Sequence, residues 1–223
     1  MKAVLFDLDD TLYPEIEFVR SGFAAVSSYL AKRYELNEHE LLEKMLLILE
    51  QNGRGKVFDI LLTGLDQHSP ENVRLLVYLY RSHLPVIHPY PDTVPVLKAL
   101  KANLRLGILT DGMASIQRNK IRALRIIDLF DAIMCTDELG EEYWKPSAVP
   151  FRIILDLLQV SPHDAIYVGN DIRKDFFAPN ELGMTTIRID RKCILNKQEC
   201  SDLGEAKHVI FAFSDILRIV KNE

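Results

Sequence analysis

The chain has 223 residues, 48 % of them hydrophobic, and a formal net charge of −5 at pH 7. This length suits one large domain or a main domain with a smaller one, and the hydrophobic content excludes a disordered chain. The acidic balance excludes the basic surface that binding to nucleic acid or to an anionic membrane requires. No apolar run approaches the roughly 18 residues that suggest a membrane span, and the three cysteines, Cys135, Cys193 and Cys200, lack metal-ligand spacing. Because the N-terminal apolar run is also too short for a signal peptide, we expect a cytoplasmic protein.

The N-terminal segment predicts a buried strand that ends in acidic residues. The apolar run 3–6 is followed at once by Asp7, Asp9 and Asp10. Side chains two residues apart in an extended segment lie on the same side, so Asp7 and Asp9 should face one way and Asp10 the other. We therefore expect Asp10 to be solvated or to cap a helix.

Residues 15–84 have the periodicity of helices. Apolar residues recur at steps of three and four, which predicts a helix with one apolar stripe. The first stripe consists of Ile16, Val19, Phe23, Val26 and Leu30. Asn37 with Glu40 resembles a capping pair, and Ser69 before Pro70 marks the start of another helix. We predict a small bundle of about four helices.

Short apolar runs alternate with amphipathic segments from residue 88 onward. The predicted strands are 104–110, 131–135, 164–170, 185–189 and 208–213. The predicted helices are 92–102, 114–125, 147–159 and 174–182, with one more at the end of the chain. This alternation favours an α/β fold, in which helices cover both faces of a doubly wound parallel sheet.

The helical segment interrupts the α/β pattern directly after its first strand. We therefore expect a Rossmann-like core formed by residues 1–13 and 89–223, and an inserted all-α helical bundle formed by residues 14–88. An insertion at this point belongs over the carboxyl ends of the strands, where open parallel sheets bind their ligands.

Three polar motifs directly follow predicted strands, and a fourth precedes a predicted helix. We expect all four at that same edge of the sheet. They are Asp7-Leu8-Asp9-Asp10-Thr11, Thr110-Asp111-Gly112, Lys145-Pro146 and Gly169-Asn170-Asp171 with Asp175. One such motif alone is ordinary turn chemistry, whereas four in this order are specific. Over the whole chain they resemble the motifs of the haloacid dehalogenase superfamily, and the helical insertion resembles the all-α cap of its phosphatases. The resemblance implies an enzyme that hydrolyses phosphoric monoesters.

The resemblance also implies a role for each motif. Asp7 would attack phosphorus and become an aspartyl phosphate, while Asp9 would protonate the leaving alcohol and then activate water. Lys145 would supply a fixed cation, and the turn Thr110-Asp111-Gly112 would bind the phosphoryl oxygens. Phosphate monoester hydrolysis needs up to ~10²¹-fold acceleration. The covalent intermediate contributes to this by dividing one difficult step into two easier displacements.

A Mg²⁺ ion is the implied cofactor, since a carboxylate nucleophile that faces an anionic phosphate needs positive charge nearby. Asp7 and the backbone carbonyl of Asp9 would bind it together with the fourth motif. Two registers are open in that motif: Asn170, which we favour by its position, or Asp171. Asp175 would orient metal-bound water in the first register and form a ligand pair with Asp171 in the second.

Two further segments bear on the site. Four residues separate Gly140 from Lys145, where the family usually has a shorter spacing, so the loop before this lysine should differ. The turn Gly53–Lys56 has two interpretations. It either joins two helices with solvated charges, or it brings Arg54 or Lys56 from the cap to a substrate anion.

The leading hypothesis is a Mg²⁺-dependent phosphatase that acts on a small phosphorylated metabolite, either a sugar phosphate or a nucleoside monophosphate. A phosphomutase of the same superfamily is an alternative, because it uses the same two acids. A binding protein that keeps the fold without catalysis is another. Asp9 disfavours a dehalogenase, which has no need of a second acid. We expect a small-molecule partner, neither nucleic acid nor membrane, and the sequence does not indicate an oligomeric state.

Overall fold

The core of the protein is a parallel sheet whose first strand in sequence lies in the middle. The computed structural model describes residues 1–191 and 204–222. The strands in these residues are β1 (Ala3–Phe6), β2 (Arg105–Thr110), β3 (Ala132–Cys135), β4 (Ala165–Gly169), β5 (Thr185–Ile189) and β6 (His208–Ile210). Their order in the sheet is β3-β2-β1-β4-β5-β6, and every neighbouring pair is parallel. The predicted α/β fold with a doubly wound parallel sheet is confirmed.

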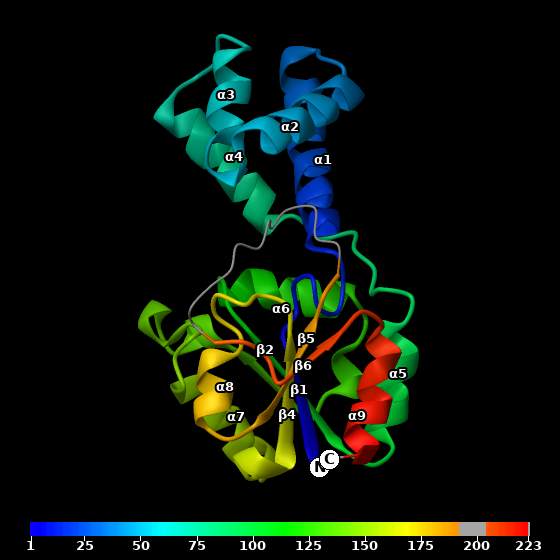
Figure 1. The fold of residues 1–223 in the computed structure, drawn as a ribbon. Helices are drawn as coiled ribbons and strands as arrows, with labels where there is room; N and C mark the ends of the chain where they lie inside the picture. The colour runs from blue at the N-terminus through cyan, green and yellow to red at the C-terminus, as the bar shows by residue number, and fades with distance from the viewer. Residues whose placement is uncertain (192–203, 223) are drawn as a thin grey trace. The chain divides into compact units, whose positions relative to one another are not determined.

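Helices cover both faces of this sheet. They are α5 (Thr93–Lys101), α6 (Ala114–Ala123), α7 (Val149–Leu158), α8 (Phe177–Glu181) and α9 (Ile216–Asn222). Figure 1 shows α7 and α8 on one face and α5 and α9 on the other. Leu5 of β1 packs in an apolar cluster with Phe151 and Ile154 of α7. The ring of its neighbour Phe6 lies 5.7 Å from that of Phe213 on the opposite face. Because both faces are covered, β1 is apolar and buried along its whole length.

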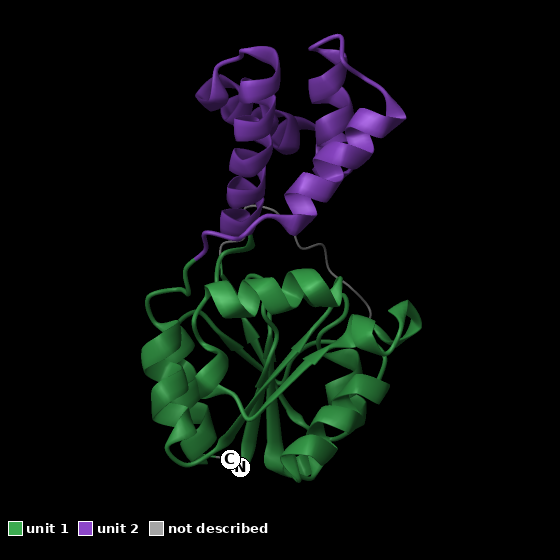
Figure 2. Ribbon diagram, turned by 180° about the vertical axis from the view of Figure 1, so that it is seen from behind, with its two compact units in different colours: residues 1–15, 88–223 green, residues 16–87 purple. Residues whose placement is uncertain are grey.

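The chain divides into two compact units (Figure 2). Residues 1–15 and 88–223 form the unit that contains the sheet, and residues 16–87 form the other. The second unit is built from α1 (Glu15–Tyr34), α2 (Glu38–Asn52), α3 (Val57–Thr63) and α4 (Pro70–Ser82). Among the described residues, no helix combines the length and the apolar character needed to cross a membrane.

The helix starts of the second unit have the capping contacts that the sequence predicts. The side chain of Asn37 accepts a hydrogen bond from the N–H of Glu40 at 3.1 Å. The Ser69 hydroxyl accepts one from the N–H of Asn72 at 3.2 Å. Each cap satisfies a backbone donor that the helix itself leaves unpaired, which is worth about 1 kcal/mol.

Aromatic side chains form the centre of the helical unit. The ring of Phe23 lies 5.9 Å from that of Phe58 and 5.8 Å from that of Tyr80. Phe23 is 4 % exposed, so α1, α3 and α4 share a core of their own.

Several predicted elements end earlier or begin later than their apolar patterns suggest. Helix α8 begins at Phe177 rather than at residue 174, because residues 171–175 form a hydrogen-bonded turn in which the N–H of Asp175 donates to the carbonyl of Asp171 at 2.9 Å. Strand β6 ends at Ile210 and is followed by a 3₁₀ helix. The 3₁₀ helices are η1 (Arg54–Lys56), η2 (Ile127–Leu129), η3 (Thr136–Glu138), η4 (Glu141–Tyr143), η5 (Pro162–Asp164) and η6 (Phe213–Asp215). Cys135 is a buried free thiol, whereas Cys193 and Cys200 lie outside the described residues.

Candidate active site

Three adjacent strands bring the polar motifs together at their carboxyl ends. Strand β1 lies between β2 and β4 in the sheet. Asp7 follows β1, Thr110 ends β2 and Asn170 follows β4, so the three residues share one edge. The N–H of Asp7 donates to the carbonyl of Val168 at 2.9 Å, which fixes the backbone beneath its carboxylate.

Lys145 is buried in a cluster of acidic and phenolic groups. Its side chain has 0 % exposure, and Nζ lies 2.6 Å from Asp7 Oδ1, 2.7 Å from Asp175 Oδ1 and 3.0 Å from the Tyr167 hydroxyl. An ammonium group is tolerated in such a place only with close partners, because its desolvation costs several kcal/mol. Burial alone would lower the pKa of Lys145, but Asp175 and Asp7 raise it well above its ordinary value, so the group stays charged.

For the pKa of Asp7, the effect of burial outweighs that of the neighbouring cation, whereas the neighbouring charges win at Lys145. Burial raises the pKa of its carboxyl group from 3.8 to about 7, although the attraction of Lys145 opposes this rise and the repulsion of Asp175 adds to it. Lys145 contacts Oδ1, and within the described part of the chain no hydrogen-bond donor reaches Oδ2. The ionised carboxylate would therefore gain stability from further positive charge beside that second oxygen.

Asp175 holds the turn that follows β4. Its Oδ1 accepts from Lys145, and its Oδ2 accepts from the backbone N–H of Asn170 at 3.1 Å and from that of Asp171 at 2.9 Å. Gly169 leaves the room that this carboxylate occupies, since a Cβ atom at residue 169 would lie 2.6 Å from Asp175 Oδ2. Asp175 thus links the fourth motif to the lysine of the third.

The two candidate metal ligands of the fourth motif differ in their surroundings. Asn170 Oδ1 accepts a 3.3 Å hydrogen bond from the Thr11 hydroxyl. Both oxygens of Asp171 accept from Arg173, at 2.9 Å from Nε and 2.7 Å from Nη2. Burial raises the pKa of Asp171, but the bonds and charge of Arg173 outweigh it and lower this pKa below its ordinary value.

The acidic side chains described near Asp7 are not arranged as a set of metal ligands. In residues 1–191 and 204–222, no three His, Cys, Asp or Glu side chains gather in a metal-binding arrangement. Main-chain carbonyl and amide oxygens would therefore have to complete a site around the Asp7 carboxylate. A hard cation that keeps several of its waters suits such a sparse set of oxygen donors.

Asp9 is held by three side chains. Lys120 Nζ lies 2.8 Å from Oδ1 and 3.0 Å from Oδ2, Gln117 Nε2 donates to Oδ2 at 2.8 Å, and the Tyr13 hydroxyl donates to Oδ1. Burial would raise the pKa of Asp9, but the charge of Lys120 and these hydrogen bonds lower it below its ordinary value. Gln117 Nε2 also lies 2.6 Å from the hydroxyl oxygen of Thr110, so one amide joins the first two motifs.

The turn after β2 is anchored by Asp111. Its Oδ1 accepts from the Thr136 hydroxyl at 2.8 Å and from the backbone N–H of Lys145 at 3.1 Å, and its Oδ2 lies 3.2 Å from Lys174 Nζ. The carboxylate therefore shapes the loop and positions the backbone of Lys145. Gly112 adopts a φ of 103°, a conformation that favours glycine.

The remaining residues singled out in the sequence lie outside this cluster. The Asp10 carboxylate accepts a hydrogen bond from the N–H of Glu15, the first residue of α1, at 2.8 Å. Because Asp10 is only 4 % exposed, the structure supports the capping role and contradicts the solvated one, the two roles that the sequence left open. The extra residues before the third motif form η4 (Glu141–Tyr143). Arg54 and Lys56 are exposed residues of η1 in the helical unit, and their contact with a substrate stays a prediction.

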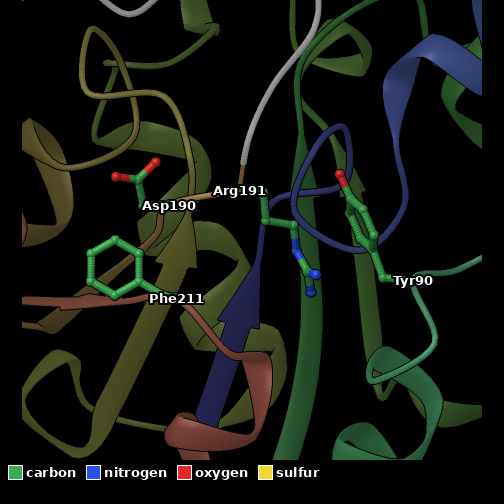
Figure 3. A pocket seen from close by; sticks show the side chains of 4 residues that line it. All are labelled: Tyr90, Asp190, Arg191 and Phe211. Carbon is green, nitrogen blue, oxygen red and sulfur yellow. The ribbon is translucent and has the colours of Figure 1, made fainter.

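A separate pocket of about 520 Å³ lies next to the end of β5 and is lined by Tyr90, Asp190, Arg191 and Phe211 (Figure 3). The Arg191 guanidinium stacks 3.7 Å from the centroid of the Tyr90 ring and forms an ion pair with Asp92 at 3.0 Å. These contacts give the arginine a structural role, and the pocket lining includes none of the motif residues.

The sheet-edge cluster and its motif order match a known family. The family model for haloacid dehalogenase-like hydrolases matches residues 4–189. The chain belongs to this family. Because that match spans β1 to β5, all four motifs of this haloacid dehalogenase-like hydrolase lie inside it.

Relatives of this haloacid dehalogenase-like hydrolase include named phosphatases. The glyceraldehyde 3-phosphate phosphatase of Methanocaldococcus jannaschii is 31 % identical over 228 residues, which cover 100 % of this chain and 98 % of that protein. The enzyme of the same name from Methanopyrus kandleri is 33 % identical over 199 residues, which cover 86 % and 84 %. The crystal structure of a phosphatase of this family from Thermococcus onnurineus has a TM-score of 0.64 at 25 % identity and covers 100 % of this chain and 99 % of that one. The protein is therefore an enzyme that hydrolyses phosphoric monoesters.

Several contacts of the motif side chains in this haloacid dehalogenase-like hydrolase are not indicated by the sequence pattern of the motifs themselves. Lys120, Gln117 and Tyr13 bind Asp9, and Tyr167 binds Lys145. A signal for two of them exists: Gln117 and Lys120 are three residues apart on one face of a predicted helix that directly follows the second motif. A helix that directly follows a strand lies close to the edge of the sheet. Polar residues on its inner face therefore indicate a buried polar partner at that edge.

Proposed function

We propose that this enzyme hydrolyses short sugar phosphates through an aspartyl-phosphate intermediate on Asp7 and that it requires Mg²⁺. The buried contact between Lys145 and Asp7 carries this proposal, because it places a fixed cation on one oxygen of a rigidly held carboxylate and leaves the other oxygen available to react. The choice of a sugar phosphate over a nucleoside monophosphate is supported by the relatives, two of which are named glyceraldehyde 3-phosphate phosphatases.

In the first step, an Asp7 oxygen forms a bond to phosphorus while the bond from phosphorus to the alcohol oxygen breaks. Lys145 offsets the repulsion between the carboxylate and the phosphate, and the Thr110 hydroxyl donates to a phosphoryl oxygen as charge develops. Asp9 gives its proton to the leaving alcohol. An arriving phosphate favours that protonated form, since a nearby negative charge raises the pKa of a carboxyl group.

In the second step, water attacks the phosphorus of the aspartyl phosphate, and Asp9 takes the proton from this water. The bond between phosphorus and Asp7 breaks, which releases inorganic phosphate and restores the carboxylate. Lys120 suits Asp9 to this step, because its charge stabilises the ionised form that acts as a base.

A divalent cation fits the donors around Asp7. The Asp7 carboxylate, the backbone carbonyl of Asp9 and the Asn170 amide oxygen would hold Mg²⁺, which would supply positive charge to the carboxylate and the phosphate. We favour Asn170 over Asp171 as the ligand, because Arg173 already occupies both oxygens of Asp171. The carboxylate of Asp175 would act from outside the ligand set by holding the turn that carries Asn170.

We also propose that the helical unit, residues 16–87, acts as a cap that excludes water from the reaction and selects small substrates. Arg54 or Lys56 would bind a substrate anion from that unit. Replacing each by methionine should then raise KM for a sugar phosphate and leave kcat nearly unchanged.

The test is a panel of sugar phosphates and nucleoside monophosphates, assayed for inorganic phosphate with Mg²⁺ and with a chelator. We expect the highest kcat/KM on a short sugar phosphate, dependence on Mg²⁺, and no turnover by Asp7→Asn. Asp128→Asn, which removes an exposed carboxylate, is the matched control. Isomerised sugar phosphate without phosphate release would indicate a phosphomutase instead, and full activity of Asp7→Asn would refute the intermediate.

A further inference from the structure

Helix α6 carries two buried polar side chains that contact the first two motifs. Gln117 is 2 % exposed and Lys120 is 4 % exposed. They are three residues apart, so they lie on the same face of the helix. The start of α6 is fixed as well, because the N–H of Ala114 donates to Asp137 Oδ2 at 2.9 Å.

The carboxylate of Asp9 is held by this face and by Tyr13. Oδ1 accepts from Lys120 and Tyr13, and Oδ2 accepts from Lys120 and Gln117. A rotation of the Asp9 side chain would break all of these bonds at once. With 22 % exposure for the side chain of Asp9 and 5 % for that of Lys120, the ion pair is little screened by solvent.

Gln117 also links two groups of the site to each other. Its Nε2 lies 2.8 Å from Asp9 Oδ2 and 2.6 Å from Thr110 Oγ1. An amide NH₂ group has two hydrogens in a fixed planar geometry, so one can be donated to each oxygen. The distance between the carboxylate of the first motif and the hydroxyl of the second is thereby set by one side chain.

We propose that Lys120 and Gln117 are positioning residues of the reaction: they hold Asp9 in the place from which it reaches the leaving oxygen, and Lys120 offsets its charge next to the phosphate. This inference rests on the proposed function, in which Asp9 is the acid and the base. Neither side chain needs to touch the substrate. Their effect should therefore depend on how much a given leaving group requires protonation.

The experiment compares kcat/KM for an alkyl phosphate with that for p-nitrophenyl phosphate, in Lys120→Met and Gln117→Leu. General acid catalysis contributes about 10²–10⁴-fold, so we expect kcat/KM for the alkyl phosphate to fall by about 100-fold in Lys120→Met. For p-nitrophenyl phosphate, whose leaving group departs without a proton, we expect a fall of less than about threefold. Lys120→Arg, which keeps the charge, should restore part of the loss, and Arg122→Met on the exposed face of α6 is the control.

An equal fall for both substrates in Lys120→Met or Gln117→Leu would overturn the inference, because a general structural defect does not distinguish leaving groups. Unchanged kcat/KM for both would also overturn it. If Lys120→Met does not fold, Gln117→Leu decides alone, since it leaves no buried charge unpaired.

In an Asp9→Asn background, Gln117→Leu should cause no further loss on the alkyl phosphate. Absence of phosphate release by the wild-type enzyme on every substrate would refute the proposed function as well, whereas wild-type turnover together with an equal fall for both substrates in the variants refutes only the positioning role.

Discussion

Replacing Asp7 by asparagine should make the metal-free enzyme more stable at neutral pH while it abolishes turnover. The pKa of Asp7 is raised from 3.8 to about 7 in the folded protein, chiefly by burial. Below pH 4 the carboxyl group is protonated in both the folded and the unfolded chain and has no effect. As the pH rises towards 7, ionisation favours the unfolded chain, so the stability of the wild type falls over this window and then levels off. Asparagine carries no ionisable proton, so the stability of the variant does not fall for this reason over the same pH window.

The size of the effect follows from that pKa. A tenfold change in an ionisation constant corresponds to about 1.4 kcal/mol, so a rise from 3.8 to about 7 sets an upper limit of roughly 4 kcal/mol at pH 8. This is a large fraction of a typical free energy of unfolding of about 5–15 kcal/mol. Asparagine can still accept the hydrogen bond of Lys145, so the substitution introduces neither a cavity nor an unpaired lysine.

The assay is urea unfolding of both proteins from pH 4 to pH 8 in the presence of a chelator. The two free energies of unfolding should agree near pH 4 and diverge as the pH rises, with the variant more stable. Added Mg²⁺ should narrow the gap by stabilising the wild type, by about 2.7 kcal/mol at a hundred times its Kd. Asp128→Asn should differ from the wild type by no more than about 0.5 kcal/mol throughout. A difference that is independent of pH, or an Asp7→Asn variant that is less stable at pH 8, would refute the account of the buried carboxylate.

Three further substitutions test the rest of the structure. Gly169→Ala places a methyl group 2.6 Å from Asp175 Oδ2, so it should lower both stability, by about 1–3 kcal/mol, and kcat. Both can be measured on one purified variant, and wild-type values of both would contradict the packing at this turn. Asn170→Ala should raise the Mg²⁺ concentration for half-maximal activity by about 10–100-fold, whereas a larger effect in Asp171→Ala would reverse our choice of ligand. Phe23→Ala should cost about 3–5 kcal/mol in thermal or urea unfolding, because it removes a ring from the core of the helical unit. A loss under about 1 kcal/mol would show that this core is not packed as described.

The order and location of the motifs could be predicted from the sequence. Uninterrupted apolar runs such as residues 3–6 are typical of strands buried on both faces, and the helical segments between them require parallel pairing. Parallel strands end at the same edge, so Asp7, Thr110 and Asn170 were expected at that edge, and the adjacency of β2, β1 and β4 in the sheet makes them neighbours. Local hydrogen bonding likewise determines the caps at Asn37 and Ser69, because donor and acceptor are within three residues of each other.

The environment of each carboxylate could not be predicted in this way. The sequence of the first motif does not distinguish Asp7, which burial pushes towards neutrality, from Asp9, which Lys120 keeps ionised. Burial acts on both carboxyl groups, and the cations that oppose it, Lys145 and Lys120, are 138 and 111 residues away along the chain and come within 3 Å only in the tertiary structure. A pKa depends on distances and solvent exclusion that fall off within a few ångströms, and a linear pattern of residues contains neither. The sequence by itself therefore determined which residues meet at the sheet edge, and the packing of α6 and of the loop before Lys145 decided what each of them can do.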